Sequence, residues 1–131
     1  ILGPESVWDA INNLPVTRIG HGVRSIEDPN LMAELAKRDI ALEVCPGSNI
    51  ALSVYPDLAS HPLNSILKAG ISISLNADDA PFFATTVGSE YQSGAKDFGL
   101  DLEQLRDISR MAMQASFADA DTKIRLLAVI G

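Results

Sequence analysis

The sequence lacks the features that mark several common classes of protein. Its 131 residues carry 10 Lys+Arg against 17 Asp+Glu, a net charge of −7. It therefore lacks the basic surface that binds nucleic-acid phosphates or anionic membranes, and we expect neither partner. No apolar run approaches the length of about 20 residues that a membrane-spanning helix needs. The single cysteine, Cys45, cannot form an internal disulfide, which predicts a reducing, cytoplasmic environment.

Short phosphate-binding and metal-binding motifs are missing as well. The sequence has no G-x-G-x-x-G fingerprint and no Walker A loop, so nucleotide-phosphate binding is unsupported. It has two His and one Cys but no H-x-H or C-x-x-C pair, and spacing alone therefore predicts no zinc site built from this chain. The composition, 47% hydrophobic and 21% charged, is that of a globular domain.

Apolar stretches typical of strands alternate with stretches of helical periodicity. The expected strands cover residues 16–20, 40–45 and 71–76. The expected helices cover residues 5–14, 28–38, 62–69, 83–97, 101–117 and 119–130. Residues 48–60 have no clean period and are expected to form a loop with about one helical turn. This alternation predicts an α/β fold with parallel strands and right-handed crossovers.

Polar residues follow the expected strands at their carboxyl ends. The first strand leads to His21 and the third leads to Asp78-Asp79. Ligands bind at this edge in parallel α/β folds. Alternation along the second strand adds Glu43, so that Glu43, His21 and Asp78 could line one cavity. The simpler alternative for Glu43 is a buried carboxylate paired with a base of the neighbouring strand, Arg18 or His21.

The third expected strand has an unusual polar face. Ser72, Ser74 and Asn76 share one side of it, whereas the residues between them are apolar. Strands of a doubly wound sheet are usually apolar on both sides. A polar face that leads to a carboxylate instead fits the inside of a barrel near an active-site mouth.

Each candidate residue also has a plain structural interpretation. Asp78 or Asp79 could cap the following helix or lie solvated in a loop. The chemical alternative is a divalent cation on one carboxylate, with the other hydrogen-bonded to a ligand. His21 is either a polar strand end or a ligand contact beside glycines. We interpret His61 as a surface or capping residue, and Cys45 as a small buried hydrophobe rather than a nucleophile.

Four ordered blocks of the sequence resemble the adenosine deaminase family. The blocks are RIGHG (18–22), LEVCPGSN (42–49), HPL (61–63) and SLNADD (74–79). The match continues at Glu90-Tyr91 and Ala115–Phe117, and it departs at Ala80, where the family usually has proline. The resemblance implies the C-terminal part of a TIM (β/α)8 barrel, with about three parallel βα units plus extra C-terminal helices. Residues 1–131 would then form a single partial domain.

The resemblance implies zinc-dependent (Zn²⁺) hydrolytic deamination of adenosine to inosine and ammonia. It implies that Asp78 ligates the zinc and holds the activated water. It further implies that Asp79 hydrogen-bonds the five-membered ring of the purine and that His21 orients and assists the attacking hydroxide. The alternatives are deamination of adenine or another 6-aminopurine, and a catalytically dead binding or structural module of the same fold.

Two blocks that the family uses for catalysis are missing from this sequence. They are the H-x-H pair and the His-Ala-Gly-Glu block, which supply the other three zinc ligands and the general acid. Because a whole barrel takes about 250 residues, we expect a partial chain that is inactive alone and binds zinc weakly through Asp78. Its open strand edges predict self-association or pairing with the missing N-terminal part. The upstream residues would separate an enzyme from a module.

Overall fold

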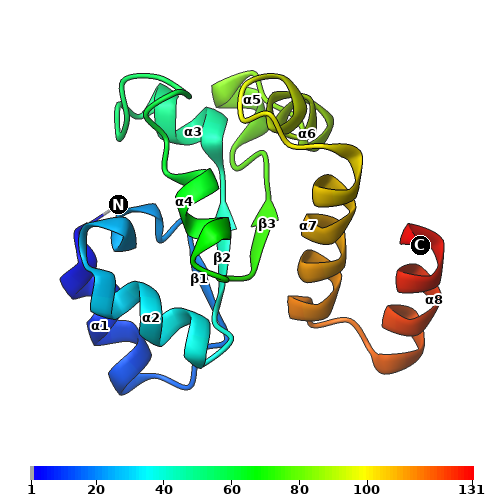
Figure 1. Ribbon diagram of the computed structural model, residues 1–131, viewed down its shortest axis with the longest axis horizontal. Helices are drawn as coiled ribbons and strands as arrows, with labels where there is room; N and C mark the ends of the chain where they lie inside the picture. The colour runs from blue at the N-terminus through cyan, green and yellow to red at the C-terminus, as the bar shows by residue number, and fades with distance from the viewer. Residues whose placement is uncertain (1) are drawn as a thin grey trace.

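The structure is a computed structural model that describes residues 2–131. Its three strands form one parallel sheet in the order β1-β2-β3, and they are β1 (Arg18–Gly20), β2 (Ala41–Val44) and β3 (Ile73–Leu75). Around them lie α1 (Pro4–Asn13), the 3-10 helix η1 (Val23–Glu27), α2 (Pro29–Lys37), α3 (Pro46–Ala51), α4 (Leu63–Lys68), α5 (Ala80–Phe83), α6 (Val87–Lys96), α7 (Leu102–Ala115) and α8 (Ala120–Ile130). In Figure 1 the strands lie at the centre, with α1 and α2 on one side and α7 and α8 on the other. The expected parallel α/β fold is confirmed.

The two faces of the sheet differ in polarity, as the alternation in the third strand predicts. Leu42, Val44 and Ile73 are fully buried on the face that α7 covers by packing against β3 and β2. The other face carries the half-buried polar side chains of Glu43 and Ser74, which are paired in the strand register. The apolar core also includes Val7, Ile11, Leu31, Leu35, Leu63, Ile66, Ile71 and Ile108. One polar face is therefore left for a site, while the other holds the fold together.

The side chain of Asp28 caps the start of α2. Its Oδ1 accepts hydrogen bonds from the backbone N–H groups of Asn30 at 2.9 Å and Leu31 at 3.3 Å. Pro29 occupies the first helical position, where a missing N–H costs nothing. The Trp8 indole also donates to Asp28 Oδ2 at 2.8 Å, so the cap ties α1 to α2.

Two segments fold differently from the sequence prediction. Helix α3 supplies the helical turn expected within residues 48–60, but it begins two residues earlier, at Pro46, because proline fits the first turn of a helix. The helix expected over 83–97 starts later: residues 80–83 form the separate helix α5, and α6 covers Val87–Lys96. Thr86 starts the second of these with a capping box, in which Thr86 Oγ1 accepts from the Ser89 N–H and Ser89 Oγ accepts from the Thr86 N–H. The prediction also missed η1.

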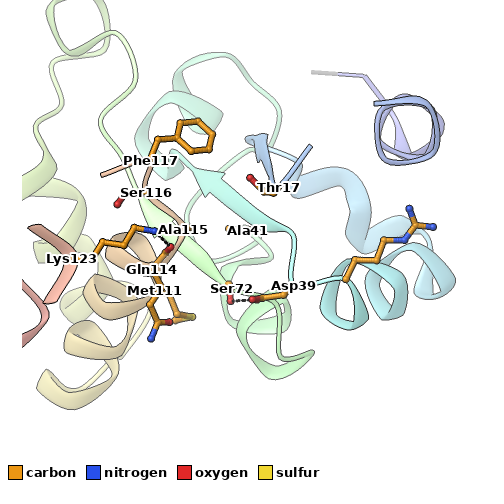
Figure 2. Close-up of a pocket in the computed structure, with 11 residues that line it drawn as sticks. Thr17, Asp39, Ala41, Ser72, Met111, Gln114, Ala115, Ser116, Phe117 and Lys123 are labelled. Carbon is orange, nitrogen blue, oxygen red and sulfur yellow. Dashed lines mark hydrogen bonds between the residues drawn. The ribbon is translucent and has the colours of Figure 1, made fainter. Parts of the chain in front are cut away.

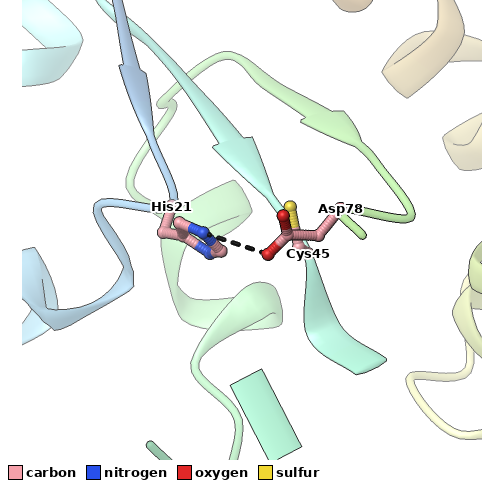
Figure 3. A group of neighbouring side chains, drawn as sticks. All are labelled: His21, Cys45 and Asp78. Atoms are coloured by element: carbon pink, nitrogen blue, oxygen red, sulfur yellow. Dashed lines mark ion pairs between the residues drawn. The ribbon is translucent and has the colours of Figure 1, made fainter. Parts of the chain in front are cut away.

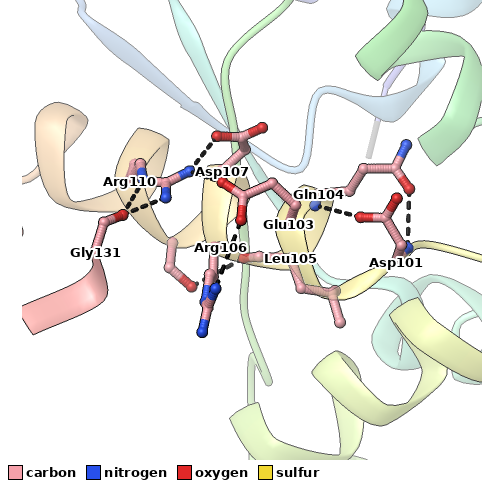
Figure 4. Close-up of polar contacts among 9 residues, drawn as sticks. Asp101, Glu103, Gln104, Leu105, Arg106, Asp107, Arg110 and Gly131 are labelled. Carbon is pink, nitrogen blue, oxygen red and sulfur yellow. Dashed lines mark hydrogen bonds and ion pairs between the residues drawn. The ribbon is translucent and has the colours of Figure 1, made fainter.

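Arg110 on α7 contacts the residue that follows α8 at the surface (Figure 4). It donates to the carbonyl of Gly131 at 2.8 Å, and two carboxylates of α7 itself, Glu103 at 2.8 Å and Asp107 at 2.5 Å, accept from its guanidinium. No residue of α8 is buried, and its Val129 side chain is exposed.

No helix among residues 2–131 combines the length and the apolar character needed to cross a membrane.

Candidate active site

Three side chains with metal-binding atoms meet at the carboxyl edge of the sheet (Figure 3). His21 follows β1, Cys45 follows β2 and Asp78 comes three residues after β3. One ligand atom from each lies within 4.8 Å of the others. His21 Nε2 lies 3.4 Å from Asp78 Oδ2, and both side chains are about one quarter exposed, at 23% and 26%. Parallel strands thus bring together residues that are far apart in the sequence.

The backbone is unusual at two of these residues. His21 has a φ of 57° and Asp78 a φ of 54°, in the left-handed region that few non-glycine residues adopt. Aspartate and histidine are among the residues that tolerate it best, yet the conformation still costs free energy. Both residues turn the chain sharply just past a strand, and such strained positions cluster at functional sites.

Helix α3 supplies a hydrogen bond that fixes the Asp78 carboxylate. Ser48 is fully buried, and its Oγ donates to Asp78 Oδ2 at 2.6 Å. Asp78 Oδ2 therefore already has a donor, whereas its second oxygen is the one free to face a cation. No pattern in the sequence predicts this role for Ser48. The available signal was a small polar residue directly after the Pro-Gly that ends the second strand.

A second set of hydrogen bonds runs from α3 to His21 and to His61. The Asn49 amide nitrogen lies 3.1 Å from His21 Nδ1, and its amide oxygen lies 3.0 Å from His61 Nε2. Asn49 is fully buried and His61 is only 5% exposed. The interpretation of His61 as a surface residue is therefore wrong. The capping alternative is closer, because the Leu63 N–H at the start of α4 donates to His61 Nδ1 at 3.3 Å.

The buried imidazole of His61 makes a prediction for stability in acid. Burial lowers its pKa from 6.5 to about 4. Above pH 6.5 the ring is neutral in both folded and unfolded chains, so it adds no pH dependence there. Between 6.5 and about 4 the unfolded chain takes up a proton that the folded chain does not. We expect the free energy of unfolding to fall by up to about 1.4 kcal/mol per pH unit across this window.

Urea unfolding of the wild type and of His61→Gln at several pH values measures this effect. Glutamine can still donate to Asn49 but does not titrate. The stability of the wild type should fall more steeply than that of the variant as the pH drops below 6.5. Equal slopes would show that His61 is already protonated, or freely protonated, in the folded protein.

Cys45 behaves as the sequence analysis interpreted it. The thiol is 6% exposed. Burial, and secondarily the charge of Asp78, raises its pKa from 9.0 to about 12. A nucleophile or a metal-binding thiolate needs the deprotonated form. Cys45 is therefore a packed neutral thiol beside the pair formed by His21 and Asp78.

Glu90 on α6 contacts the first turn of α3 and holds it in place. It is 3% exposed, it accepts a hydrogen bond from the Gly47 N–H at 3.2 Å, and burial raises its pKa above the usual value. A Cβ at Gly47 would lie 2.5 Å from Glu90 Oε1, so only glycine allows this approach. The contact positions the helix that carries Ser48 and Asn49.

The remaining predicted residues lie outside the group at the strand ends. Glu43 pairs with Arg18 at 3.3 Å, one of the two bases expected for it, and it is half-buried rather than buried. Glu43 is not part of the group of possible metal ligands, which consists of His21, Cys45 and Asp78. Asp79 is exposed at the N-cap position of α5 and makes no capping hydrogen bond with its side chain.

The donor atoms at this edge fit a zinc ion. Imidazole nitrogen, thiolate sulfur and carboxylate oxygen are the ligands that zinc takes in proteins. Ser48 orients the carboxylate of Asp78, as partners of metal ligands usually do. A zinc ion needs three or more protein ligands. The neutral thiol of Cys45 leaves Asp78 as the ligand best prepared in this chain.

One cavity of the described structure is lined by residues outside this group (Figure 2). Its volume is about 480 Å³ and its lining includes Thr17, Ala41 and Ser72, which precede or begin the three strands. It therefore opens at the amino-terminal edge of the sheet. Because ligands bind at the carboxyl edge in such folds, cavity size does not locate the candidate site.

The chain is similar in sequence to known deaminases along its whole length. A family model described as adenosine deaminase matches residues 1–131. The chain is 48% identical over 131 residues to an adenine deaminase of Agrobacterium fabrum, covering 100% of this chain and 40% of the relative. It is 46% identical over 128 residues to an adenine deaminase of Sinorhizobium medicae, covering 98% and 40%.

Solved structures agree on the fold. The crystal structure of an adenine deaminase from Arthrobacter aurescens superposes with a TM-score of 0.95 at 29% identity, over 98% of this chain and 39% of that one. An amidohydrolase from Burkholderia ambifaria with bound zinc gives a TM-score of 0.88 at 25% identity, over 98% and 36%. The chain spans about 40% of the length of the curated relatives. Its fold is the expected part of a TIM barrel.

Proposed function

Because this chain belongs to the adenosine deaminase family, we propose that it forms the C-terminal part of a zinc-dependent enzyme that hydrolyses the 6-amino group of a purine. The observation that carries the proposal is the meeting of His21 with Asp78, at 3.4 Å, on the carboxyl edge of parallel strands. We propose adenine as the substrate, because the curated relatives named above are adenine deaminases. Adenosine, the first expectation from the sequence, has less support.

The reaction needs water to replace an amino group at C6 of the ring. Adenine and water give hypoxanthine and ammonia, with a tetrahedral carbon between them. Zinc, when bound, supplies the acidity that makes hydroxide available from water at neutral pH. Asp78 would be one of its ligands. The H-x-H pair and the His-Ala-Gly-Glu histidine of the family would supply the others, from residues outside this sequence.

The residues of this chain act by binding and orientation. Asp78 Oδ2 accepts a hydrogen bond from Ser48 at 2.6 Å, which would leave its second oxygen for the zinc. His21 would orient the attacking water by a hydrogen bond from its ring. Asp79 is exposed, and its side chain makes no capping hydrogen bond at the start of α5. It would accept or donate a hydrogen bond at the five-membered ring of the purine. Protonation of N1 needs a general acid, which the family draws from the His-Ala-Gly-Glu block.

A substrate comparison with the full-length protein tests this proposal. Purified protein loaded with zinc is incubated with adenine and, separately, with adenosine, and ammonia and the purine product are measured. We expect hypoxanthine from adenine at a kcat/KM at least about 10²-fold above that for adenosine, because a pocket shaped for the free base has no room for ribose. Faster release of inosine from adenosine would restore the first expectation, and turnover of neither would favour a binding module.

The isolated chain of residues 1–131 serves as the control. Without the family's other zinc ligands, it should neither turn over adenine nor hold stoichiometric zinc. Stoichiometric zinc together with turnover by this chain alone would contradict the proposal that the other zinc ligands and the general acid lie outside residues 1–131. The expected self-association of the isolated chain also stays a prediction, which light scattering can check.

A further inference from the structure

We propose that Asn49 and His61 are positioning residues that fix the proton of His21 on Nε2. This arrangement would explain how His21 is oriented toward the attacking water. Only that role of His21 rests on the proposed function. The arrangement itself rests on four consecutive hydrogen bonds or contacts that link α4, α3 and the end of β1.

The chain of contacts starts at a group whose role is unambiguous. A backbone N–H can only donate, and Leu63 is the first residue of α4, where the N–H has no partner within the helix. It lies 3.3 Å from His61 Nδ1, so that nitrogen must offer a lone pair. In a neutral imidazole the proton is then on the other nitrogen, Nε2.

His61 is neutral for a physical reason. The ring lies edge-on between Tyr55, with centroids 5.2 Å apart, and Phe98, with centroids 5.6 Å apart. Burial among these rings lowers its pKa to about 4. At neutral pH the ring therefore has one donor and one acceptor, and both are used.

The proton on His61 Nε2 orients the Asn49 amide. It is donated to Asn49 Oδ1 at 3.0 Å, so the amide NH2 group must point the other way, toward His21 Nδ1 at 3.1 Å. A flipped amide would place NH2 against an N–H at one end. Because Asn49 is fully buried, no bulk water could compensate for that clash of donors.

The same logic then fixes His21. Its Nδ1 accepts from the Asn49 amide and therefore carries no proton, which leaves the ring proton on Nε2, 3.4 Å from Asp78 Oδ2. An imidazole whose Nε2 carries a proton is a hydrogen-bond donor there and cannot ligate a metal through that atom. Although His21 belongs to the group of possible ligands, the network assigns it to a water or a carboxylate instead.

Nitrogen-15 NMR of the full-length protein, labelled at histidine, tests the inference directly. The two ring nitrogens of a neutral histidine have well-separated shifts, according to which one carries the proton. The signals of His21 are identified by their loss in His21→Gln. We expect a protonated Nε2 and an unprotonated Nδ1. A proton on Nδ1 in the wild type would overturn the inference.

Two substitutions of Asn49 and His61 test the cause of this pattern. Asn49→Asp replaces the donating NH2 with an oxygen that can only accept when ionised, so a proton should appear on His21 Nδ1. His61→Leu removes the donor that orients the amide, and His61→Gln restores one. For His61→Leu we expect a mixture of His21 rings protonated on Nδ1 and on Nε2. For His61→Gln we expect the wild-type proton on Nε2. An unchanged His21 pattern in both Asn49→Asp and His61→Leu would also overturn the inference.

Kinetics separate this positioning role from a general loss of structure. For Asn49→Asp we expect kcat to fall by about 10- to 100-fold, the range seen when partners of site residues are lost, while KM changes little. If the full-length protein turns over no aminopurine, the proposed function fails, but the NMR pattern still decides the proton on His21. If turnover is normal and the pattern is wrong, only this inference fails.

Discussion

Replacing Asp78 with alanine in the full-length protein is expected to abolish both zinc binding and deamination. The side chain is the zinc ligand that we propose for this chain, and Ser48 donates to one of its oxygens at 2.6 Å. Losing one of four ligands lowers zinc affinity, and without zinc hydroxide is scarce at neutral pH. We expect kcat/KM for adenine to fall by more than about 10³-fold. Zinc content measured by atomic absorption should fall together with the rate.

The neighbouring residue provides the matched control. Asp79→Ala removes an adjacent carboxylate that is exposed and that has no hydrogen bond to the strand-end group. We expect it to raise KM and lower kcat while zinc stays stoichiometric. Zinc loss in Asp79→Ala with zinc retention in Asp78→Ala would exchange the two roles. Unchanged kinetics in either variant would remove that assignment.

Replacing His21 with alanine is expected to cause the second largest loss. His21 lies 3.4 Å from Asp78 Oδ2 and is held at Nδ1 by Asn49, so it is placed to orient a water beside the carboxylate. Positioned acid–base or hydrogen-bonding groups contribute about 10²- to 10⁴-fold to a rate. We expect a loss of kcat in that range.

The zinc content of His21→Ala separates two roles for this residue. If His21 orients water, zinc should remain stoichiometric while kcat falls. If zinc is lost as well, His21 is a ligand, and the proton assignment at Nε2 is wrong. A kcat within a few-fold of the wild type would remove His21 from the site altogether.

Periodicity and strand alternation were sufficient for the main features of the fold. The polar face of β3 and the cap at Asp28 are local patterns, and both are present in the structure. The start of α6 at Val87, four residues later than predicted, depends on one capping box at Thr86. The helical turn expected within residues 48–60 is present as α3, but its start at Pro46 was not predicted, although proline commonly starts helices.

The supporting residues of the site could not be found from the sequence in the same way. His61 lies 40 positions from His21 in the chain, and its burial depends on packing against Tyr55 and Phe98. Ser48 and Asn49 are small polar residues whose partners come from other strands. Only the register of parallel strands brings these groups together, and spacing along the chain does not record it.

The central claim is that Asp78 and His21 converge on one bound cation while Asp79 faces the purine. A crystal of the full-length protein with zinc, measured on both sides of the zinc absorption edge, tests it most directly. We expect one anomalous peak about 2.0–2.2 Å from an Asp78 oxygen, with His21 Nε2 close by but not bonded to it. A zinc peak with no contact to Asp78, or one bonded to His21 Nε2, would contradict it.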